Sequence, residues 1–94
     1  MVDIKWSNDA LLDLDAISEY ISQDSTETSK TFIQEIFKKV ENLSTFPSIG
    51  RTVPDQRNEK IHEILHKNYR IIYEIKDDLI EILIVIHGSR ILRI

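Results

Sequence analysis

The fold is decided by residues 69–87, which read YRIIYEIKDDLIEILIVIH. Within them, two runs rich in Ile, Leu, Tyr and Val, residues 69–76 and 79–87, are separated by a pair of aspartates. β-Branched and aromatic residues are typical of strands, and a two-residue polar connection is typical of a tight hairpin. A third run of this kind, residues 59–66, precedes them across another two-residue gap. The C-terminal half therefore predicts three antiparallel strands in meander order.

Alternation along these strands predicts which side chains share a face, because successive side chains of a strand point to opposite sides. The middle strand alternates Tyr69, Ile71, Tyr73 and Ile75 with Arg70, Ile72 and Glu74, and the last alternates Ile80, Ile82, Ile84 and Ile86 with Glu81, Leu83, Val85 and His87. If the tyrosine and isoleucine faces pack on helices, Arg70 and His87 emerge together on the opposite, open face of the sheet.

Upstream, the sequence predicts one strand and two helices. Residues 2–6 alternate apolar and polar side chains, as a half-buried strand does. The capping residue types Ser, Asn and Asp follow, and an apolar side chain at every third or fourth position then predicts a helix from about residue 9 to 22. Ser25 or Thr26 can cap a second helix, whose apolar positions run from Phe32 to Leu43.

This order of elements indicates one α+β domain over residues 1–94. The second helix ends before a turn that contains Pro47 and Gly50, the strongest helix-breaking residues of the chain. We expect the two helices to form an antiparallel hairpin packed on one face of a small twisted sheet. The pattern leaves open where the first strand lies in that sheet.

Composition narrows the classes of function. The chain has 94 residues, no cysteine, and 16 acidic against 12 basic residues, for a net charge of −4. The lack of cysteine excludes a disulfide framework, a thiolate metal site and a cysteine nucleophile. No stretch approaches the ~18–20 apolar residues of a membrane span, and the N-terminus lacks the features of a signal peptide. We expect a cytoplasmic protein with no membrane contact, and its acidity is unfavourable for general nucleic-acid binding.

The charge divides unevenly along the chain. Residues 1–50 carry a net charge of −5, whereas residues 51–94 carry +1 and contain every arginine. Because arginine offers a planar, permanently charged set of donors, the second half is where we expect a binding site. Arg70 stands within an apolar strand, so its charge must either pair or reach solvent. The alternative to a functional role is a structural ion pair with Glu74 or Glu81.

For His62, His66 and Arg51, a purely structural role is the alternative to a functional one. His62 and His66 share a face of their predicted strand but lie ~13 Å apart at roughly 3.3 Å per residue, which is too far to bind one ion. We expect no metal site and no cofactor. Arg51 follows Gly50, where the alternative to function is a hydrogen bond to loop carbonyls or to a helix C-terminus.

Four segments of the chain resemble the ParE/RelE toxin superfamily: FPSIGRTVP at 46–54, HEIL at 62–65, YRIIYEI at 69–75 and ILIVIHGSR at 82–90. Together with the N-terminal strand and the opening of the first helix, the resemblance covers nearly the whole chain. It implies a toxin of a type II toxin-antitoxin module, held inactive by an antitoxin and linked to growth arrest or plasmid stabilisation. RelE-like members cleave messenger RNA in the ribosomal A site, and ParE-like members are associated with inhibition of DNA gyrase.

Details of the segments are closer to the ParE branch. His62-Glu63-Ile64 resembles the Arg-Glu-Leu of ParE-type strands, and His87-Gly88-Ser89-Arg90 resembles the ParE His-Gly-Arg-Arg ending. Ribonuclease members generally have a basic strand, which Glu63 interrupts here, and often a late tyrosine, which residues 91–94 lack. The resemblance therefore implies a gyrase inhibitor that acts by binding, with these target-binding residues: Arg51, Arg70, His87, Arg90 and Arg93.

Two alternatives stay open. One is a RelE-like, ribosome-dependent messenger RNA endoribonuclease whose catalytic residues are Arg70, His87 and Arg90, because a histidine can exchange a proton near neutral pH and two guanidinium groups can hold the phosphate. The other is a non-toxic member that retains only antitoxin binding, since His62 replaces the usual arginine. Under the ParE reading the protein is a binding inhibitor and not an enzyme.

Overall fold

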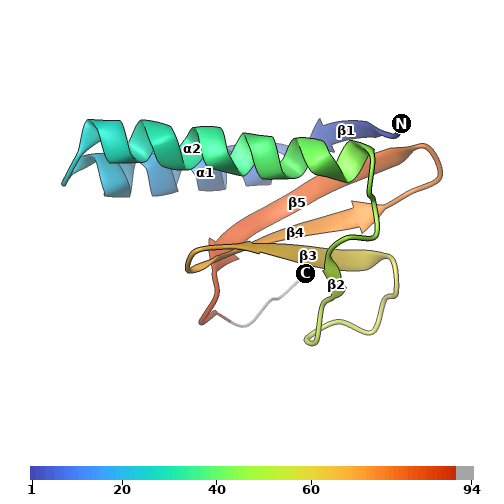
Figure 1. The fold of residues 1–94 in the computed structure, drawn as a ribbon. Coiled ribbons are helices and arrows are strands. Elements are labelled where there is room, and N and C mark those ends of the chain that lie inside the picture. The colour runs from blue at the N-terminus through green and yellow to red at the C-terminus, as the bar shows by residue number, and fades with distance from the viewer. Residues whose placement is uncertain (91–94) are drawn as a thin grey trace.

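Two helices form one layer and five strands form the other in the computed structural model, which describes residues 1–90 (Figure 1). The elements in chain order are β1 (Asp3–Trp6), α1 (Asn8–Ser22), α2 (Thr26–Glu41), the 3₁₀ helix η1 (Asn42–Ser44), β2 (Arg51–Thr52), β3 (Ile61–His66), β4 (Tyr69–Ile75) and β5 (Leu79–His87). The strands lie in the order β1-β5-β4-β3-β2. The predicted α+β class is confirmed.

The helix starts are set by serine caps. The Ser7 side chain accepts a hydrogen bond from the Ala10 amide at 3.0 Å, and Ser25 accepts one from the Thr28 amide at 3.1 Å, as N-cap residues do. The sequence pattern missed β2, because a strand of two residues is too short to show a period. It also began the third-last strand at residue 59, whereas β3 begins at Ile61.

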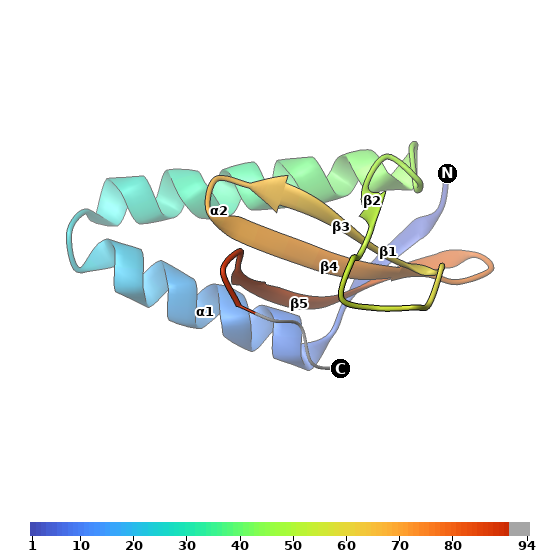
Figure 2. The ribbon, with the colours of Figure 1, turned by 90° about the horizontal axis from the view of Figure 1, so that it is seen from below.

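The first strand, whose place the sequence left open, lies at the edge of the sheet and pairs in parallel with β5, from Asp3 opposite Leu79 to Trp6 opposite Ile82. The other neighbouring strands are antiparallel. Because α1 follows β1 directly, it lies along β5, and α2 lies along β3 (Figure 2). Within residues 1–90, neither helix is long and apolar enough to cross a membrane.

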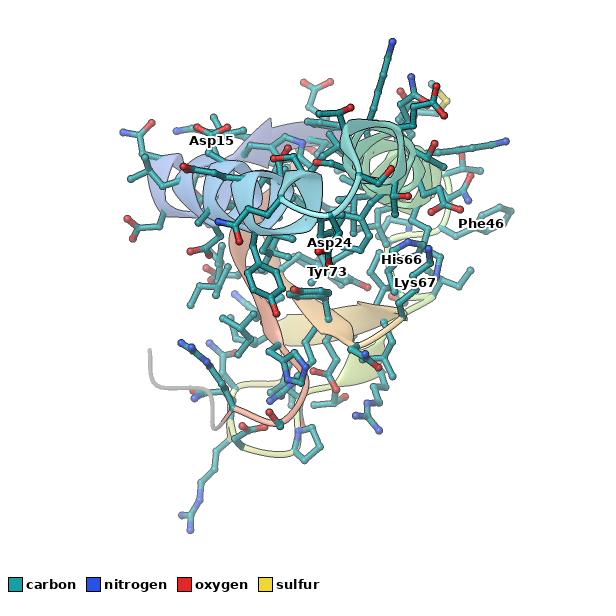
Figure 3. All side chains as sticks on the ribbon, turned by 90° about the vertical axis from the view of Figure 1, so that its left-hand side faces the viewer. Asp15, Asp24, Phe46, His66, Lys67 and Tyr73 are labelled. Carbon is teal, nitrogen blue, oxygen red and sulfur yellow. The ribbon has the colours of Figure 1, made fainter. Side chains whose placement is uncertain are left out.

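Apolar side chains pack on both faces of the sheet. The main core lies between sheet and helices, where Figure 3 shows Tyr73, and its buried members are Ala10, Leu14, Phe32, Ile36, Val40, Leu43, Ile71, Tyr73, Ile80, Ile82 and Val85. A smaller cluster on the opposite face consists of Val53, Ile61 and Ile72, with Leu83, Ile84 and Ile86 packed against it. Residues 53–60 connect β2 to β3 across this second face (Figure 2).

A β-bulge interrupts the pairing of β4 with β5. Tyr73 pairs with Ile82, whereas the preceding residue, Ile72, pairs with Ile84. Leu83 is therefore the extra residue on β5, and its carbonyl accepts a hydrogen bond from the Ser7 hydroxyl at 2.9 Å. An extra residue reverses the alternation of side chains beyond it.

This reversal overturns the predicted faces of β5. Past the bulge, Val85 belongs to the helix-facing core and His87 pairs with Tyr69. Arg70 pairs with Ile86, on the opposite face. The prediction that Arg70 and His87 share the open face of the sheet is therefore wrong.

Candidate functional site

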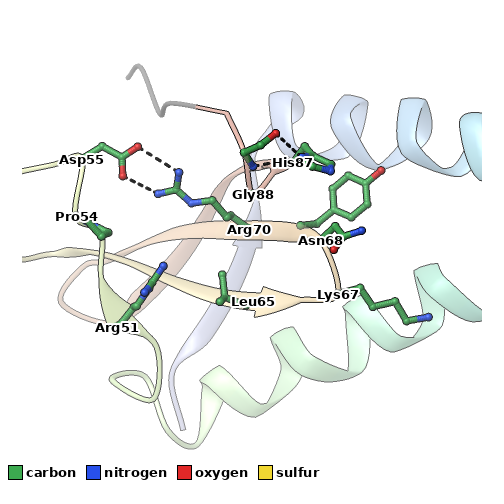
Figure 4. Close-up of a pocket in the computed structure, with 11 residues that line it drawn as sticks. Arg51, Pro54, Asp55, Leu65, Lys67, Asn68, Arg70, His87 and Gly88 are labelled. Carbon is green, nitrogen blue, oxygen red and sulfur yellow. Dashed lines mark hydrogen bonds and ion pairs between the residues drawn. The ribbon is translucent and has the colours of Figure 1, made fainter.

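A cavity of about 400 Å³, which we call the target cavity, opens where the ends of β3, β4 and β5 meet the loop after β2 (Figure 4). Three of the five predicted target-binding residues line it, namely Arg51, Arg70 and His87. Arg90 lines a neighbouring cavity between α1 and β5, which shares His87 with the first. Arg93 lies outside the described residues.

The turn before β2 places Arg51. The Tyr73 hydroxyl donates to the Pro47 carbonyl at 2.8 Å and accepts from the Gly50 amide at 3.1 Å. Burial raises the pKa of Tyr73, so the hydroxyl keeps its proton. A Cβ atom on Gly50 would lie 2.6 Å from this hydroxyl and closer still to the Glu63 carbonyl oxygen, so only glycine fits. The next residue, Arg51, then pairs with Glu63 across the sheet.

Glu63 is the centre of an ion-pair network. Its side chain is fully buried, and each carboxylate oxygen accepts from a different arginine: Arg51 Nε at 2.5 Å and Arg70 Nε at 2.6 Å. Two charged donors offset the cost of burying one carboxylate. The residue that the sequence suggested as an interruption of a basic strand thus holds the two arginines in place.

Arg70 is almost completely enclosed, with 8% of its side chain exposed. Besides the bond to Glu63, its Nη1 and Nη2 atoms donate to the two carboxylate oxygens of Asp55 at 3.2 and 2.8 Å, and Nη1 also donates to the Arg90 carbonyl at 3.1 Å. The hydrogen bonds that Arg70 donates to Asp55, and after them the bond that it donates to Glu63, raise the pKa of Arg70 despite its burial. All three of its nitrogens therefore have protein acceptors.

These partners differ from those that the sequence suggested. Arg70 pairs with neither Glu74 nor Glu81, because Glu74 stands four positions further along β4, roughly 13 Å away, and Glu81 bonds to Lys76 at 2.8 Å. The sequence analysis missed Asp55 altogether. It lies in an irregular loop, where no periodicity could indicate that its carboxylate reaches β4.

His87 stands at the rim of the target cavity. Its Nδ1 accepts a hydrogen bond from the Ser89 amide at 3.2 Å and lies 2.7 Å from the Ser89 hydroxyl. Its ring packs edge-on against Tyr69, with 5.6 Å between ring centroids. The Gly88 amide donates to the Asn68 carbonyl at 2.6 Å and so fixes the turn after β5 against the turn between β3 and β4.

The cavity is thus mixed in charge. Arg51 and Lys67 supply its open cations, with side chains 60% and 58% exposed, while Asp55 and Glu63 place two carboxylates beside Arg70. Among the described residues, no three His, Asp or Glu side chains form a group that could hold a metal ion. Such an arrangement can bind a polar or acidic partner through Arg51, with Arg70 as the rigid support behind it.

Comparison with known proteins identifies the family. The family model described as the ParE toxin of the type II toxin-antitoxin system, parDE, matches residues 4–92. Comparison with the curated proteins gives no match. Among solved structures, a chain of the chromosomal ParDE TA system from P. aeruginosa is similar, with 24% identity, a TM-score of 0.78 and coverage of 95% of this chain and 98% of that one, which supports the fold. Because the family match covers almost the whole sequence, the chain belongs to the ParE toxin family of type II toxin-antitoxin systems.

Proposed function

We propose that this ParE-type toxin arrests growth in the cytoplasm by binding and inhibiting DNA gyrase, and that a cognate antitoxin neutralises it. The target-binding surface is the target cavity with Arg51, Arg70 and His87 at its walls. The main support for the proposal is that all three side-chain nitrogens of Arg70 donate hydrogen bonds to acceptors within the protein. An arginine held in this way can shape a binding surface, but it has little capacity left to stabilise a reacting phosphate.

The same observation disfavours RNA cleavage. Attack by a 2′-hydroxyl needs a base, an acid, and cations for the charge that builds on phosphorus. A phosphate that reached Arg70 would have to displace Asp55 and would lie beside the carboxylate of Glu63. Both carboxylates repel it. A chain with a net charge of −4 also lacks long-range attraction to the ribosome.

Family membership supports the antitoxin as partner. The family model describes toxins of type II modules, and the similar P. aeruginosa chain belongs to a ParDE system. Antitoxin segments that fold on binding can cover a large area of a small domain. We therefore expect a short reading frame beside this one to encode a DNA-binding head with a charged tail, and its co-expression to restore growth.

Three measurements test the proposal. Expression of the chain alone should stop growth, the purified chain should block supercoiling by gyrase, and primer extension on ribosome-bound messenger should show no new ends. An exposed-residue variant at the far end of α2, Lys30→Ala, serves as the matched control and should behave as the wild type. Normal growth at verified expression would favour the non-toxic alternative. Messenger cleavage that disappears in a folded Arg70→Ala variant would replace gyrase binding with the RelE-like activity.

A further inference from the structure

A surface of exposed apolar side chains continues from the target cavity across the outer side of β3. Its centre is formed by Ile49 and Leu65, with 64% and 49% of each residue exposed, and its rim by the cations Lys39, Arg51 and Lys67. We call these five residues the apolar strip. Large apolar side chains exposed next to one another mark interaction sites more often than single ones do.

Two cavities make the strip continuous with the target cavity. A second cavity, of about 360 Å³, is lined by Lys39, Ile49, Arg51 and Leu65, and the last two of these residues also line the target cavity. Phe46, which is 60% exposed, stands in the same turn as Ile49, whose amide donates to the Phe46 carbonyl at 3.1 Å. Figure 3 shows Phe46 projecting on the α2 side of the molecule, the side on which His66 and Lys67 also lie.

The charge of the strip contrasts with that of the chain. Lys39 Nζ donates to the Leu65 carbonyl at 2.7 Å, which holds its charge beside Leu65. Arg51 is 60% exposed beyond its bond to Glu63, and that carboxylate is fully buried. Lys67 Nζ lies 3.6 Å from Glu35 Oε1, so Lys39 and Arg51 supply most of the positive charge around the apolar side chains, in a protein whose net charge is −4.

We propose that the apolar strip binds an acidic segment of the toxin's protein target, and that this segment seats an apolar side chain between Ile49 and Leu65. Carboxylates of the segment then meet Lys39 and Arg51 at the two sides. This inference rests on the proposed function, because the strip is continuous with the cavity to which that function assigns the target. Separated cations around an apolar centre suit such a protein segment, whereas a nucleic-acid strand is held by a denser row of cations.

The first test uses the purified full chain and the gyrase supercoiling reaction. Two variants weaken the strip, the double variant Ile49→Ser/Leu65→Ser and the single variant Lys39→Gln, and all three positions are exposed. The controls make changes of the same kind at exposed positions elsewhere, Leu12→Ser on α1 and Lys30→Gln on α2. We expect the double variant to need about tenfold more protein for equal inhibition, as for loss of an interface anchor, and the controls to need the wild-type amount.

The second test does not depend on gyrase. A labelled peptide, Glu-Glu-Leu-Phe-Glu-Glu, and its counterpart with lysines in place of the glutamates are titrated with each variant and followed by fluorescence anisotropy. The acidic peptide should bind the wild type and the controls, and should bind the double variant about tenfold more weakly. The lysine peptide should not bind. Unfolding midpoints equal to that of the wild type confirm that each variant is folded.

The outcomes separate the two proposals. If the wild type and the strip variants inhibit gyrase equally well, the inference is wrong and the proposed function stands. If the acidic peptide binds the strip variants as tightly as the wild type, the inference is also wrong, and the gyrase reaction alone decides the proposed function. If the wild type leaves gyrase untouched but its strip binds the acidic peptide, the gyrase proposal fails and the strip remains a site for an acidic protein segment.

Discussion

Two regions of the molecule, the helix side of the sheet and the ion-pair network around Glu63, are stabilised by different interactions. On the helix side, residues such as Ile36, Ile71 and Ile80 are completely buried among other apolar side chains. On the opposite face, which also holds a smaller apolar cluster, the buried carboxylate of Glu63 lies between Arg51 and Arg70. Loss of a methyl group costs stability roughly in proportion to the space it leaves, whereas loss of one charge leaves its partner buried and uncompensated. The helix-side core therefore tolerates small changes, and the ion-pair network does not.

The largest effect should follow from Arg70→Ala. This change leaves Glu63 with one partner and removes the two bonds from Arg70 to Asp55, so we expect the free energy of unfolding in urea to fall by about 3–5 kcal/mol, as for a broken buried ion pair. Ile36→Val, on the helix side, removes one methyl group from a fully buried position and should cost only about 0.5–1.5 kcal/mol.

A double variant sharpens this comparison. Replacing both charged partners, in Arg70→Met/Glu63→Met, removes the buried carboxylate together with the buried guanidinium, so neither is left facing the site of the other. The loss in the double variant should therefore be well below the sum of the two single losses, because residues in one network are coupled. Strict additivity would mean that the two side chains do not stabilise each other.

The next largest effect should follow from Tyr73→Phe. This residue belongs to the helix-side core, but its hydroxyl holds the turn that carries Arg51, through the Pro47 carbonyl and the Gly50 amide. Loss of that hydroxyl removes the partner of a partly buried carbonyl and of the Gly50 amide, at a cost of about 1–2 kcal/mol and a thermal midpoint lowered by about 4–8 °C for each kcal/mol. Tyr20→Phe, at a position 69% exposed, is the control and should leave the midpoint unchanged. If the thermal midpoint of Tyr73→Phe equals that of Tyr20→Phe, the Tyr73 hydroxyl does not stabilise the protein through the turn.

The sequence predicted the helix side of the sheet far better than the opposite face. The spacing of apolar residues around Phe32 and Ile36 has one reading, a helix with one buried side, and the structure agrees. The run ILIVIH at 82–87 is apolar in both phases, so either face of β5 can be buried and a one-residue bulge leaves no mark in the sequence. This is why the predicted faces of β5 were wrong.

The sequence analysis singled out Arg51, Arg70 and His87, which line one cavity, but not the ion-pair network that holds the two arginines. Arg70 was singled out because a charge in an apolar strand needs a partner, and that argument holds. Which partner it finds depends on where the loop after β2 returns to the sheet, and no local pattern encodes the position of Asp55 there. Long-range ion pairs depend on the assembled fold, whereas helices and strands are visible in local periodicity.

His66, the last residue of β3, lies on the helix side of the sheet and should make stability depend on pH. It is buried against the Phe32 ring, with 5.2 Å between centroids, and its Nε2 lies 3.3 Å from Glu35 Oε1. Burial first, and then the charges of Lys39 and Lys67, lower the pKa of His66, while Glu35 acts in the opposite direction. The unfolded chain therefore binds more protons than the native chain just below the ordinary pKa of 6.5. The contribution of His66 to stability is therefore fully present above pH 6.5 and is lost as the pH falls below it toward the pKa of the native state.

Urea unfolding at steps between about pH 7.5 and 5.5 measures this slope near the histidine pKa. His66→Gln should flatten it. Asp13 contributes with the opposite sign and at lower pH, since burial raises its pKa from 3.8 and the native chain then binds the extra proton. A slope that is unchanged in His66→Gln would assign the pH dependence to another group.

The smallest change in stability should follow from Arg51→Gln, although it touches the same carboxylate as Arg70→Ala. Glu63 keeps its bond to Arg70, which still balances its charge, and the Arg51 side chain is 60% exposed, so the change removes one partly exposed donor. We expect the free energy of unfolding to fall by less than about 1 kcal/mol, as for a partly exposed ion pair. Under the proposed function, inhibition of gyrase should nevertheless weaken, because Arg51 is shared by the target cavity and the apolar strip. A loss of stability as large as that of Arg70→Ala would show that both arginines support the fold, and the proposal that Arg51 is the open cation that meets the target would then fail.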